Sequence, residues 1–478
     1  MAIDKITASG LGDGGVSTAD IADDAVTLNK LSASGTKDAT TFLRGDDSFQ
    51  VVAVTPTAVS DQANTSTGGF SMPAGTTAQR PGSPDTGESR YNSTNGSLEF
   101  YDGSAWINTN LIPSVDSATG TIYAGATSNL VITITNSTDT VDVVYKEGAT
   151  VVATVTGQTV SSGSVTTAVP SAVYGQTAGD TISVSVLNAD GTPSSNAVSK
   201  TVIGLPSGGT ITTSGSSRIH SFTSSSNLVV PSGLTLSNVE YLVIAGGGSG
   251  GSNNGGGAGG GGAGGYRSSV VGQSSGRGSS AESRLTLTAA TYSVTVGAGA
   301  ASGNNNAGNI GNNSVFSSIT SLGGGGGGNQ VINSAGGAGG GGGEVVGSYA
   351  GASGTAGQGF DGGDGMYSGG NAGGGGGGSG SKPATSTSSA VGPGGSGTSS
   401  NITGSSVTRA GGGGASGNNQ AGSSGGSGGG GNGGPGSGGS GTVTSGAVNT
   451  GSGGGGTYTG GAGGATGGSG IVIIRYAL

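Results

Sequence analysis

The chain has 478 residues, of which 114 are glycine, and only 8% of its residues carry a charge. It contains no cysteine, which excludes disulfide bonds and thiol chemistry. The formal net charge is −9 and there is no basic patch, so nucleic-acid binding has no electrostatic support. No apolar stretch approaches the length of a membrane-spanning helix, and the first residues, MAIDKITASG, lack the apolar region of a secretory signal peptide.

Residues 1–52 are predicted to form an N-terminal attachment or oligomerisation region. Within residues 17–32, STADIADDAVTLNKLS, the apolar residues follow the spacing of one helix face. A helix of this length is not stable alone, so it is either a surface helix packed on its own domain or a docking or trimerising element. The tripeptide Arg44-Gly45-Asp46 is an integrin-binding signature in animal matrix proteins, and we interpret it here as a turn.

Residues 53–112 are predicted to be a linker followed by a small β-hairpin module. Asn95-Gly96 is a strong hairpin signal, and Asp102-Gly103 marks a second turn before Trp106, the only tryptophan. Alternation places Leu98 and Phe100 on one face of the hairpin and Tyr101 on the other. So small a sheet buries little surface alone, which predicts that it packs on copies of itself or on a neighbouring domain.

Residues 113–205 are predicted to form an Ig-like β-sandwich. Strands are expected at residues 130–135, 140–146, 150–155, 164–169 and 181–187, where β-branched and polar residues alternate between turn signals. The domain is either a spacer or a binding module, and the absence of distinctive residues favours a spacer.

Residues 206–478 are predicted to form one glycine-rich domain framed by a β-sandwich. Strands are expected at residues 210–213, 218–222, 228–230, 239–245, 284–288, 292–296 and 471–476. The last segment, GIVIIRY, is almost continuously apolar, which predicts a central strand buried on both faces. We therefore expect it to share a sheet with the strands that precede residue 246.

The glycines between these strands occur in runs, and two interpretations are open for them. Glycine-rich tracts without a period are typical of flexible linkers. The alternative is a bundle of polyproline II helices, in which the absence of Cβ lets neighbouring backbones hydrogen bond directly. The apolar segments and final strand favour the bundle, in which the segments between runs become turns at its two ends. The predicted fold class is therefore mainly β and modular, with the last sandwich enclosing polyglycine helices.

Several stretches resemble structural proteins of tailed phages. IADDAVTLNKLSASGT and TFLRGDDSF resemble N-terminal regions of fibre and tail-associated proteins, and TTAQRPGSPDTGESRYNSTNGSLEFYDGSAW resembles a recurring phage module. VEYLVIAGGGSGG, YSVTVGAGA, NITGSSVTRAGGGG and GGSGIVIIRY are similar to glycine-rich tail fibre or adhesin-like proteins of marine phages. The glycine-rich half also resembles polyglycine-sandwich adhesins, but this chain carries its own N-terminal modules and a β-sandwich frame.

The resemblance implies a virion protein, made in the host cytoplasm, that recognises a bacterial surface glycan or outer-membrane protein through loops between glycine runs. It also implies a homotrimer attached by its N-terminus to other virion proteins. The alternatives are a purely structural component, such as a capsid decoration or a neck or tail connector, and a polysaccharide-degrading spike. We expect no enzymatic activity, no nucleic-acid partner and no membrane insertion.

Candidate contact residues are the few aromatic and basic groups of the glycine-rich half, because such groups supply most contact energy at interfaces. They are Tyr266, Arg267, Tyr349, Phe360, Tyr367, Lys382, Arg409 and Tyr458. Few residues could form a catalytic triad or a histidine-based metal site, since His220 is the only histidine. Asp361 and Asp364 lie close together, and GGDG around Asp364 is similar to a calcium turn, but no repeat follows and a plain turn is favoured. No cofactor is expected.

Overall fold

The computed structural model describes the backbone of residues 41–43 and 49–51, and residues 72–477 with short gaps at 95, 109–111, 138–139, 190, 304–306, 330–332, 345–348, 368–370 and 460–462. The predicted helix at residues 17–32 and the Arg44-Gly45-Asp46 tripeptide lie outside these residues. The chain divides into two compact units, Met1–Ala74 and Gly75–Leu478. In the first unit, β1 (Thr41–Leu43) pairs antiparallel with β2 (Phe49–Val51).

The hairpin module is a four-stranded sheet in the order β3–β4–β5–β6. Its elements are β3 (Ala74–Gly75), a 3-10 turn η4 (Thr77–Gln79), β4 (Ser89–Asn92), β5 (Ser97–Tyr101) and β6 (Trp106–Asn108). Gly96, in the turn between β4 and β5, has a φ of 66°, which suits the glycine of the predicted hairpin. The expected alternation is confirmed, because Leu98 and Phe100 are exposed while Glu99, between them, is buried.

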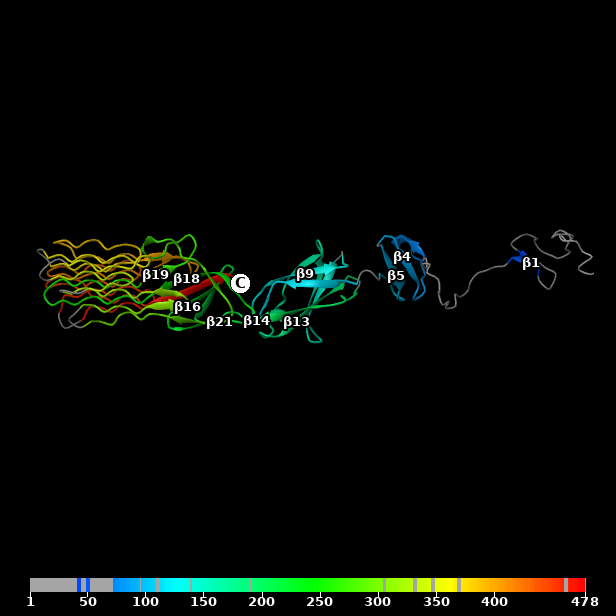
Figure 1. The fold of residues 1–478 in the computed structure, drawn as a ribbon, viewed down its shortest axis with the longest axis horizontal. Helices are drawn as coiled ribbons and strands as arrows, with labels where there is room; N and C mark the ends of the chain where they lie inside the picture. The colour runs from blue at the N-terminus through cyan, green and yellow to red at the C-terminus, as the bar shows by residue number, and fades with distance from the viewer. Residues whose placement is uncertain are drawn as a thin grey trace, which may run out of the picture. The chain divides into compact units, whose positions relative to one another are not determined.

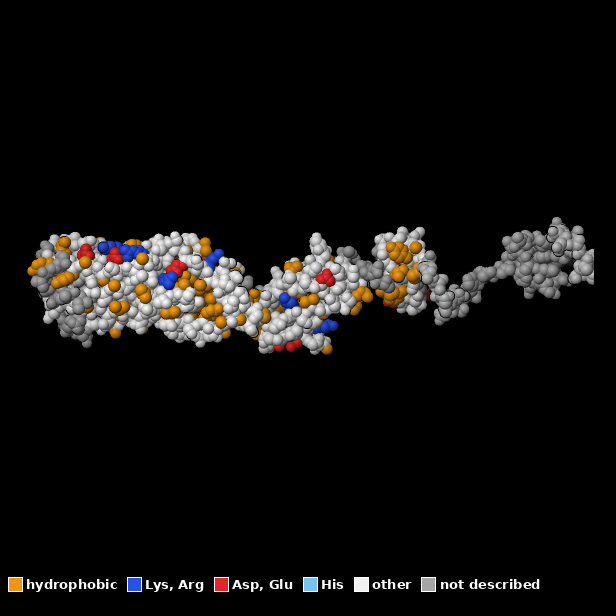
Figure 2. Space-filling view, viewed as in Figure 1, with side chains coloured by type: hydrophobic (Ala, Val, Ile, Leu, Met, Phe, Trp, Pro, Cys, Tyr) orange, Lys and Arg blue, Asp and Glu red, His pale blue; other side chains and the backbone are white. Residues whose placement is uncertain are grey.

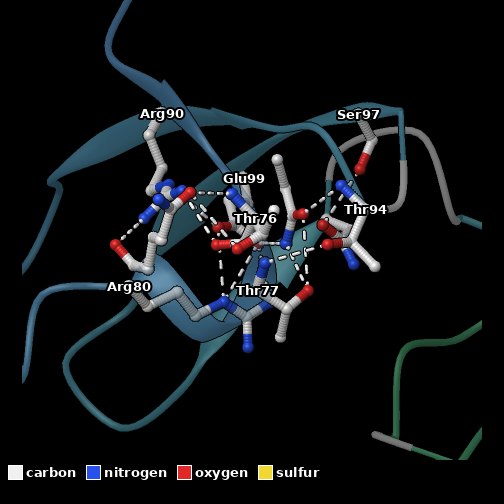
Figure 3. Close-up of polar contacts among 10 residues, drawn as sticks. Thr76, Thr77, Arg80, Arg90, Thr94, Ser97 and Glu99 are labelled. Carbon is white, nitrogen blue, oxygen red and sulfur yellow. Dashed lines mark hydrogen bonds and ion pairs between the residues drawn. The ribbon is translucent and has the colours of Figure 1, made fainter.

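The covered face of this module is polar, which the sequence did not predict. Glu99 is 1% exposed and accepts hydrogen bonds from Arg80 (2.7 Å) and Asn92 (2.9 Å), while Arg90 Nε lies 3.3 Å from its other oxygen (Figure 3). Arg90 also donates to the carbonyl oxygens of Gln79 (2.6 Å) and Thr76 (3.1 Å). Burial raises the pKa of Glu99, but the hydrogen bonds and the two arginines outweigh it and leave the pKa below its usual value.

Residues 114–203 form a sandwich of two sheets, in the orders β11–β10–β13–β14–β8 and β12–β9–β7. Its strands are β7 (Ser114–Thr119), β8 (Ile122–Tyr123), β9 (Asn129–Thr135), β10 (Thr140–Glu147), β11 (Thr150–Thr159), β12 (Ser164–Ala168), β13 (Thr181–Asn188) and β14 (Val198–Ile203), with one short helix, α1 (Ser171–Tyr174). Both sheets contribute to one apolar core, in which Leu130, Tyr145 and Val184 are fully buried. The five predicted strands are present, and the sheet orders are those of an Ig-like sandwich.

The glycine-rich domain is framed by a second sandwich. One sheet has the order β15–β16–β26–β18–β19, with β20 also paired to β18, and the other has the order β17–β21–β22–β23. The strands are β15 (Thr210–Ser214), β16 (Ser217–Phe222), β17 (Ser226–Val230), β18 (Leu236–Ile244), β19 (Tyr266–Ser268), β20 (Leu285–Leu287), β21 (Ala290–Thr295), β22 (Ser314–Phe316), β23 (Ile319–Ser321) and β26 (Ile471–Ala477). A separate hairpin joins β24 (Thr398–Ser400) to β25 (Val407–Arg409), and η5 (Gly276–Gly278) is a short 3-10 turn.

Strand β26 lies between β16 and β18 and is antiparallel to both, so the predicted pairing of the last strand is confirmed (Figure 1). Val472 and Ile474 point into the core between the two sheets, whereas Ile471 and Ile473 point into a core on the opposite face. That second core includes Ala263, Tyr266 and Ala338, which come from the glycine-rich segments or directly follow one. The almost continuous apolar sequence of β26 is therefore explained by burial on both faces.

The glycine runs extend from this sandwich as wavy segments that lie side by side (Figure 1). Residues 256–265 are buried, and their N–H groups donate to different neighbouring runs in turn. Gly259 donates to Gly328 and Gly262 to Gly325, whereas Gly260 donates to Gly374 and Ala263 to Gly377. Every third residue thus returns to the same neighbouring run. This period equals the three residues per turn of polyproline II, although that conformation stays a prediction.

The packing between runs leaves no room for side chains at most of these glycines. A Cβ placed on Gly260 would overlap the carbonyl oxygen of Gly413, and one on Gly376 would overlap that of Gly261. Most of the buried N–H groups in the runs donate to backbone carbonyl oxygens of other runs, as burial requires. Among the described residues, the runs are therefore ordered segments and not free linkers.

Candidate functional site

The glycine runs begin and end at two opposite ends of the bundle. The segment after β18 runs out to Ser252, which bridges to Thr457, and the chain then returns along residues 257–265 into β19. We call the turns at the end away from β18 and β19 the distal turns. Their described residues include 253–256, 366–367, 371, 387–390, 417–421, 437–441 and 457–459.

Hydrogen bonds join the distal turns to one another. The Asn253 N–H donates to Thr457 (3.1 Å), and the Asn418 N–H donates to Asn371 (3.2 Å). The Gln420 side chain donates to the carbonyl oxygen of Ser388 (3.1 Å). Segments that are far apart in the sequence therefore lie next to one another at this end.

Three of the eight candidate contact residues lie at this end. Tyr367 is in a distal turn and is 51% exposed, and Tyr458 is in another and is half-buried. Tyr349 is half-buried, and its carbonyl oxygen accepts a hydrogen bond from the N–H of Gly365, close to the turn of Tyr367. Figure 2 shows apolar side chains, in orange, at this end of the domain.

Phe360 and Lys382 lie instead on the side of the bundle, beside Arg277 and Asp361. Arg277 forms an ion pair with Asp361 (2.9 Å), and its guanidinium lies 5.5 Å from the centre of the Phe360 ring. The hydrogen bond from Arg277 holds the pKa of Asp361 below its usual value, and the charge of Lys382 contributes. Charged side chains on one face of the domain are visible in Figure 2. Asp361 is therefore engaged by an arginine, and Asp364 accepts a hydrogen bond from the Gly351 N–H (2.9 Å).

Tyr266 and Arg409 lie at the near end, where the runs meet the sandwich. Tyr266 is in β19 and fully buried, and Arg409 in β25 is 8% exposed. Burial raises the pKa of Tyr266 to about 12 and lowers the pKa of Arg409. Because a receptor contact needs accessible atoms, neither residue enters the binding surface that we propose below.

Arg267, the eighth candidate, lines a polar cleft of about 350 Å³. Its guanidinium holds Glu282 through two hydrogen bonds, of 2.9 and 2.6 Å, and also donates to the carbonyl oxygen of Thr320 (3.2 Å). The hydrogen bonds that Arg267 donates to Glu282 raise the pKa of Arg267. The other residues around the cleft are Ser275, Ser279, Ser280, Ala356, Gly357 and Gln358. The sequence analysis did not identify Glu282 or Gln358, although Glu282 is one of only four acidic residues after residue 245.

A buried carboxyl group lies beneath the distal turns. Glu344 is fully buried, and neither of its carboxylate oxygens has a hydrogen-bond partner. Burial raises its pKa to about 7; the nearby Gly257 N–H opposes this only in part, because it does not reach hydrogen-bond geometry. Nothing in the residues around Glu344 predicts its burial, because that burial depends on how the runs pack.

Potential metal-ligating side chains are not grouped in the part of the chain that the structure describes. No group of three or more His, Cys, Asp and Glu side chains is gathered there. His220 is buried; its Nδ1 contacts the Gly208 carbonyl oxygen (2.7 Å) and its Nε2 contacts the Tyr476 hydroxyl (2.8 Å). Burial lowers its pKa, which favours a neutral structural histidine. None of the described helices is long and apolar enough to cross a membrane.

Comparison with known proteins matches the part of the chain just described. No curated protein matches the chain at a significant level. Residues 220–477, more than half of the chain, match the model of a family described as a glycine-rich domain. The match begins in β16 and ends with β26, so it spans both the framing sandwich and the glycine runs. Through these residues, the chain belongs to the glycine-rich domain family.

Proposed function

We propose that this protein is a tail fibre or adhesin of a tailed phage, and that it binds a bacterial surface glycan or outer-membrane protein through the distal turns. The observation that carries the proposal is the separation of scaffold from turns. The runs are bonded backbone to backbone, with little room for side chains, whereas the distal turns carry exposed side chains such as Tyr367. Turns on a rigid scaffold can change sequence without changing the fold, which suits a receptor-binding surface.

The alternative is a structural virion component in which the domain only stiffens or shields. It predicts that the distal turns have no binding role and that the protein lies on the capsid, neck or tail connector. Antibody labelling of particles in electron micrographs separates the two, because an adhesin labels the far end of the tail.

The direct test is adsorption of the fluorescently labelled full-length chain to a panel of Gram-negative marine bacteria. In one variant, residues 387–390 are exchanged for Gly-Ser-Gly-Ser, and in another Tyr367→Ser removes the exposed ring. The control is Thr403→Gly, in the hairpin between β24 and β25. We expect the distal variants to lose at least tenfold in adsorption with unchanged melting temperature, and the control to adsorb normally. Equal adsorption of all variants would favour the structural role.

We further propose that copies of the chain associate through the exposed face of the hairpin module. Tyr91, Leu98 and Phe100 are 40, 42 and 37% exposed there, and Figure 2 shows the apolar patch. Among residues 72–108 that the structure describes, no apolar side chain is buried, because the covered face holds Arg90, Asn92 and Glu99. A small sheet without an apolar core gains most from an apolar partner, and the same uncharged face on a second copy supplies one.

The apolar area of this face is small, so we expect it to be one of several contacts between the copies. At roughly 200 Å² for a large side chain, the three leave about 240 Å² exposed, well below the ~800 Å² per partner of an independent interface. The test is sedimentation of the full chain and of Phe100→Ser. We expect the wild-type chain to be a trimer. Phe100→Ser should dissociate at a protein concentration at least tenfold higher than Val271→Ser, which is a control at another exposed apolar residue. A monomeric wild-type chain would refute this proposal.

A further inference from the structure

The polar cleft beside η5 has the features of a small binding site. Arg267 of β19 forms one wall, the segment of residues 275–282 forms another, and the turn at residues 356–358 closes the third side. Its volume of about 350 Å³ lies at the lower end of the range for ligand pockets, roughly 300–1,000 Å³.

The walls of the cleft are held in place by contacts that leave little freedom. Glu282 accepts hydrogen bonds not only from Arg267 but also from the Tyr241 hydroxyl (2.8 Å) and the Ser275 hydroxyl (3.2 Å). A Cβ on Gly276 would overlap the backbone of Gln358, so the two loops pack directly against each other. A site with fixed walls binds with a lower entropy cost than one that must order on binding.

Several polar groups that line the cleft have no protein partner among the described residues. An arginine side chain has five N–H groups, and those of Arg267 that do not serve Glu282 and Thr320 remain unused. Gln358 accepts a hydrogen bond from the Leu322 N–H (2.9 Å) through its side-chain oxygen, which leaves its amide N–H groups unused. The hydroxyls of Ser279 and Ser280 line the same cleft. The cleft thus offers N–H donors and hydroxyls, while the charge of its arginine is neutralised by Glu282.

We infer that this cleft binds a single sugar unit of a bacterial surface polysaccharide. A sugar supplies the hydroxyl oxygens, and in N-acetylated units the carbonyl oxygen, that accept from Arg267 and Gln358. Its hydroxyls also exchange hydrogen bonds with the two serines. An apolar ligand is disfavoured because it would leave these polar groups desolvated and unpaired. The inference rests on the proposed function, since it names a chemical class of receptor, but it places that contact outside the distal turns.

The test is saturation-transfer NMR of the full chain with glucose, galactose, mannose, rhamnose and N-acetylglucosamine. Ser280→Trp fills the cleft from an exposed position without touching the Arg267–Glu282 pair. Gln358→Glu keeps the oxygen that accepts from Leu322 and replaces the amide donors with an acceptor. Ser405→Trp, at an exposed position in the turn between β24 and β25, is the matched control.

We expect at least one of these sugars to bind the wild type, and the affinity to fall at least tenfold in Ser280→Trp and in Gln358→Glu. Ser405→Trp should bind like the wild type. The absence of a signal for every sugar, or equal binding by Ser280→Trp, would overturn the inference. Cell adsorption of the same variants is a separate readout of the proposed function, because the distal-turn variants keep the cleft intact and should bind the sugar normally.

Discussion

The close packing of glycine runs predicts that a single methyl group in the middle of a run destabilises the domain. In Gly325→Ala, the new Cβ would overlap the carbonyl oxygen of Ser334 and lie 2.8 Å from the nitrogen of Gly340. Both neighbours are backbone atoms, so a run must move as a whole. Such movement strains two hydrogen bonds. The Gly325 N–H donates one to the Ala338 carbonyl oxygen (2.9 Å), and the Gly325 carbonyl oxygen accepts the other from the Gly262 N–H (2.7 Å).

The expected loss of stability in Gly325→Ala is the sum of two effects, the overpacking and the strained hydrogen bonds. Overpacking costs about 1–3 kcal/mol, and the two strained hydrogen bonds add about 1 kcal/mol each. We expect a loss of roughly 3–5 kcal/mol, which lowers Tm by about 6–20 °C for a domain of this size. The measurement is thermal unfolding of the full chain, followed by circular dichroism or calorimetry.

The matched control is Gly434→Ala, in another run. The Gly434 N–H also donates a hydrogen bond to a backbone oxygen, that of Gly456 (2.8 Å). A Cβ on Gly434, however, would meet side-chain atoms of Thr457 and Val443 at 3.3 Å. These contacts need shifts of only a few tenths of an ångström, so Tm should change little. If Gly325→Ala melts within 2 °C of Gly434→Ala, the runs are not packed as described.

Four further predictions concern stability and activity. Because the folded pKa of Glu344 is raised from 4.5 to about 7, the folded state holds the proton more tightly, and stability should fall by up to about 3 kcal/mol as pH rises from 4.5 to 7. Glu344→Gln should lack this part of the pH dependence of Tm, and an identical pH profile would contradict the burial of the charge. Ile473→Ala, in a fully buried position of β26, should lower the free energy of unfolding by about 2–5 kcal/mol. Val448→Ala, at an exposed position, should lower it by less than ~0.5 kcal/mol. Deletion of residues 471–478 should abolish the protease resistance of the domain. The purified chain should release no reducing sugars from bacterial polysaccharide, and their release would show a hydrolase.

Alternation of apolar and polar residues was enough to predict most strands of the two sandwiches. The position of β26 was also predictable, because a strand apolar on both faces must lie inside a sheet. The buried Glu99 was not, since the same alternation is usually interpreted with the apolar face inward. In this module Arg80, Arg90 and Asn92 together satisfy the carboxylate, and that combination depends on the turn at Thr77–Gln79.

The candidate site was predictable by residue type but not by location. Tyr266 and Tyr367 are the same residue type near glycines, yet one is fully buried and the other is 51% exposed. The difference arises because the chain reverses at both ends of the bundle, and the order in which the runs stack is set by backbone contacts. Glycines carry no side chain, so the sequence holds little information about which run lies beside which.

The position of β26 also imposes an order in time on synthesis and folding. Arg475 bonds to Glu240, a residue made 235 positions earlier, and β26 fills the space between β16 and β18. At roughly 5–20 residues per second, the ribosome leaves these two strands with unpaired edges for about 10–50 s. Exposed strand edges invite pairing with other chains. The nascent domain therefore keeps two open strand edges until the last strand arrives and closes the sheet.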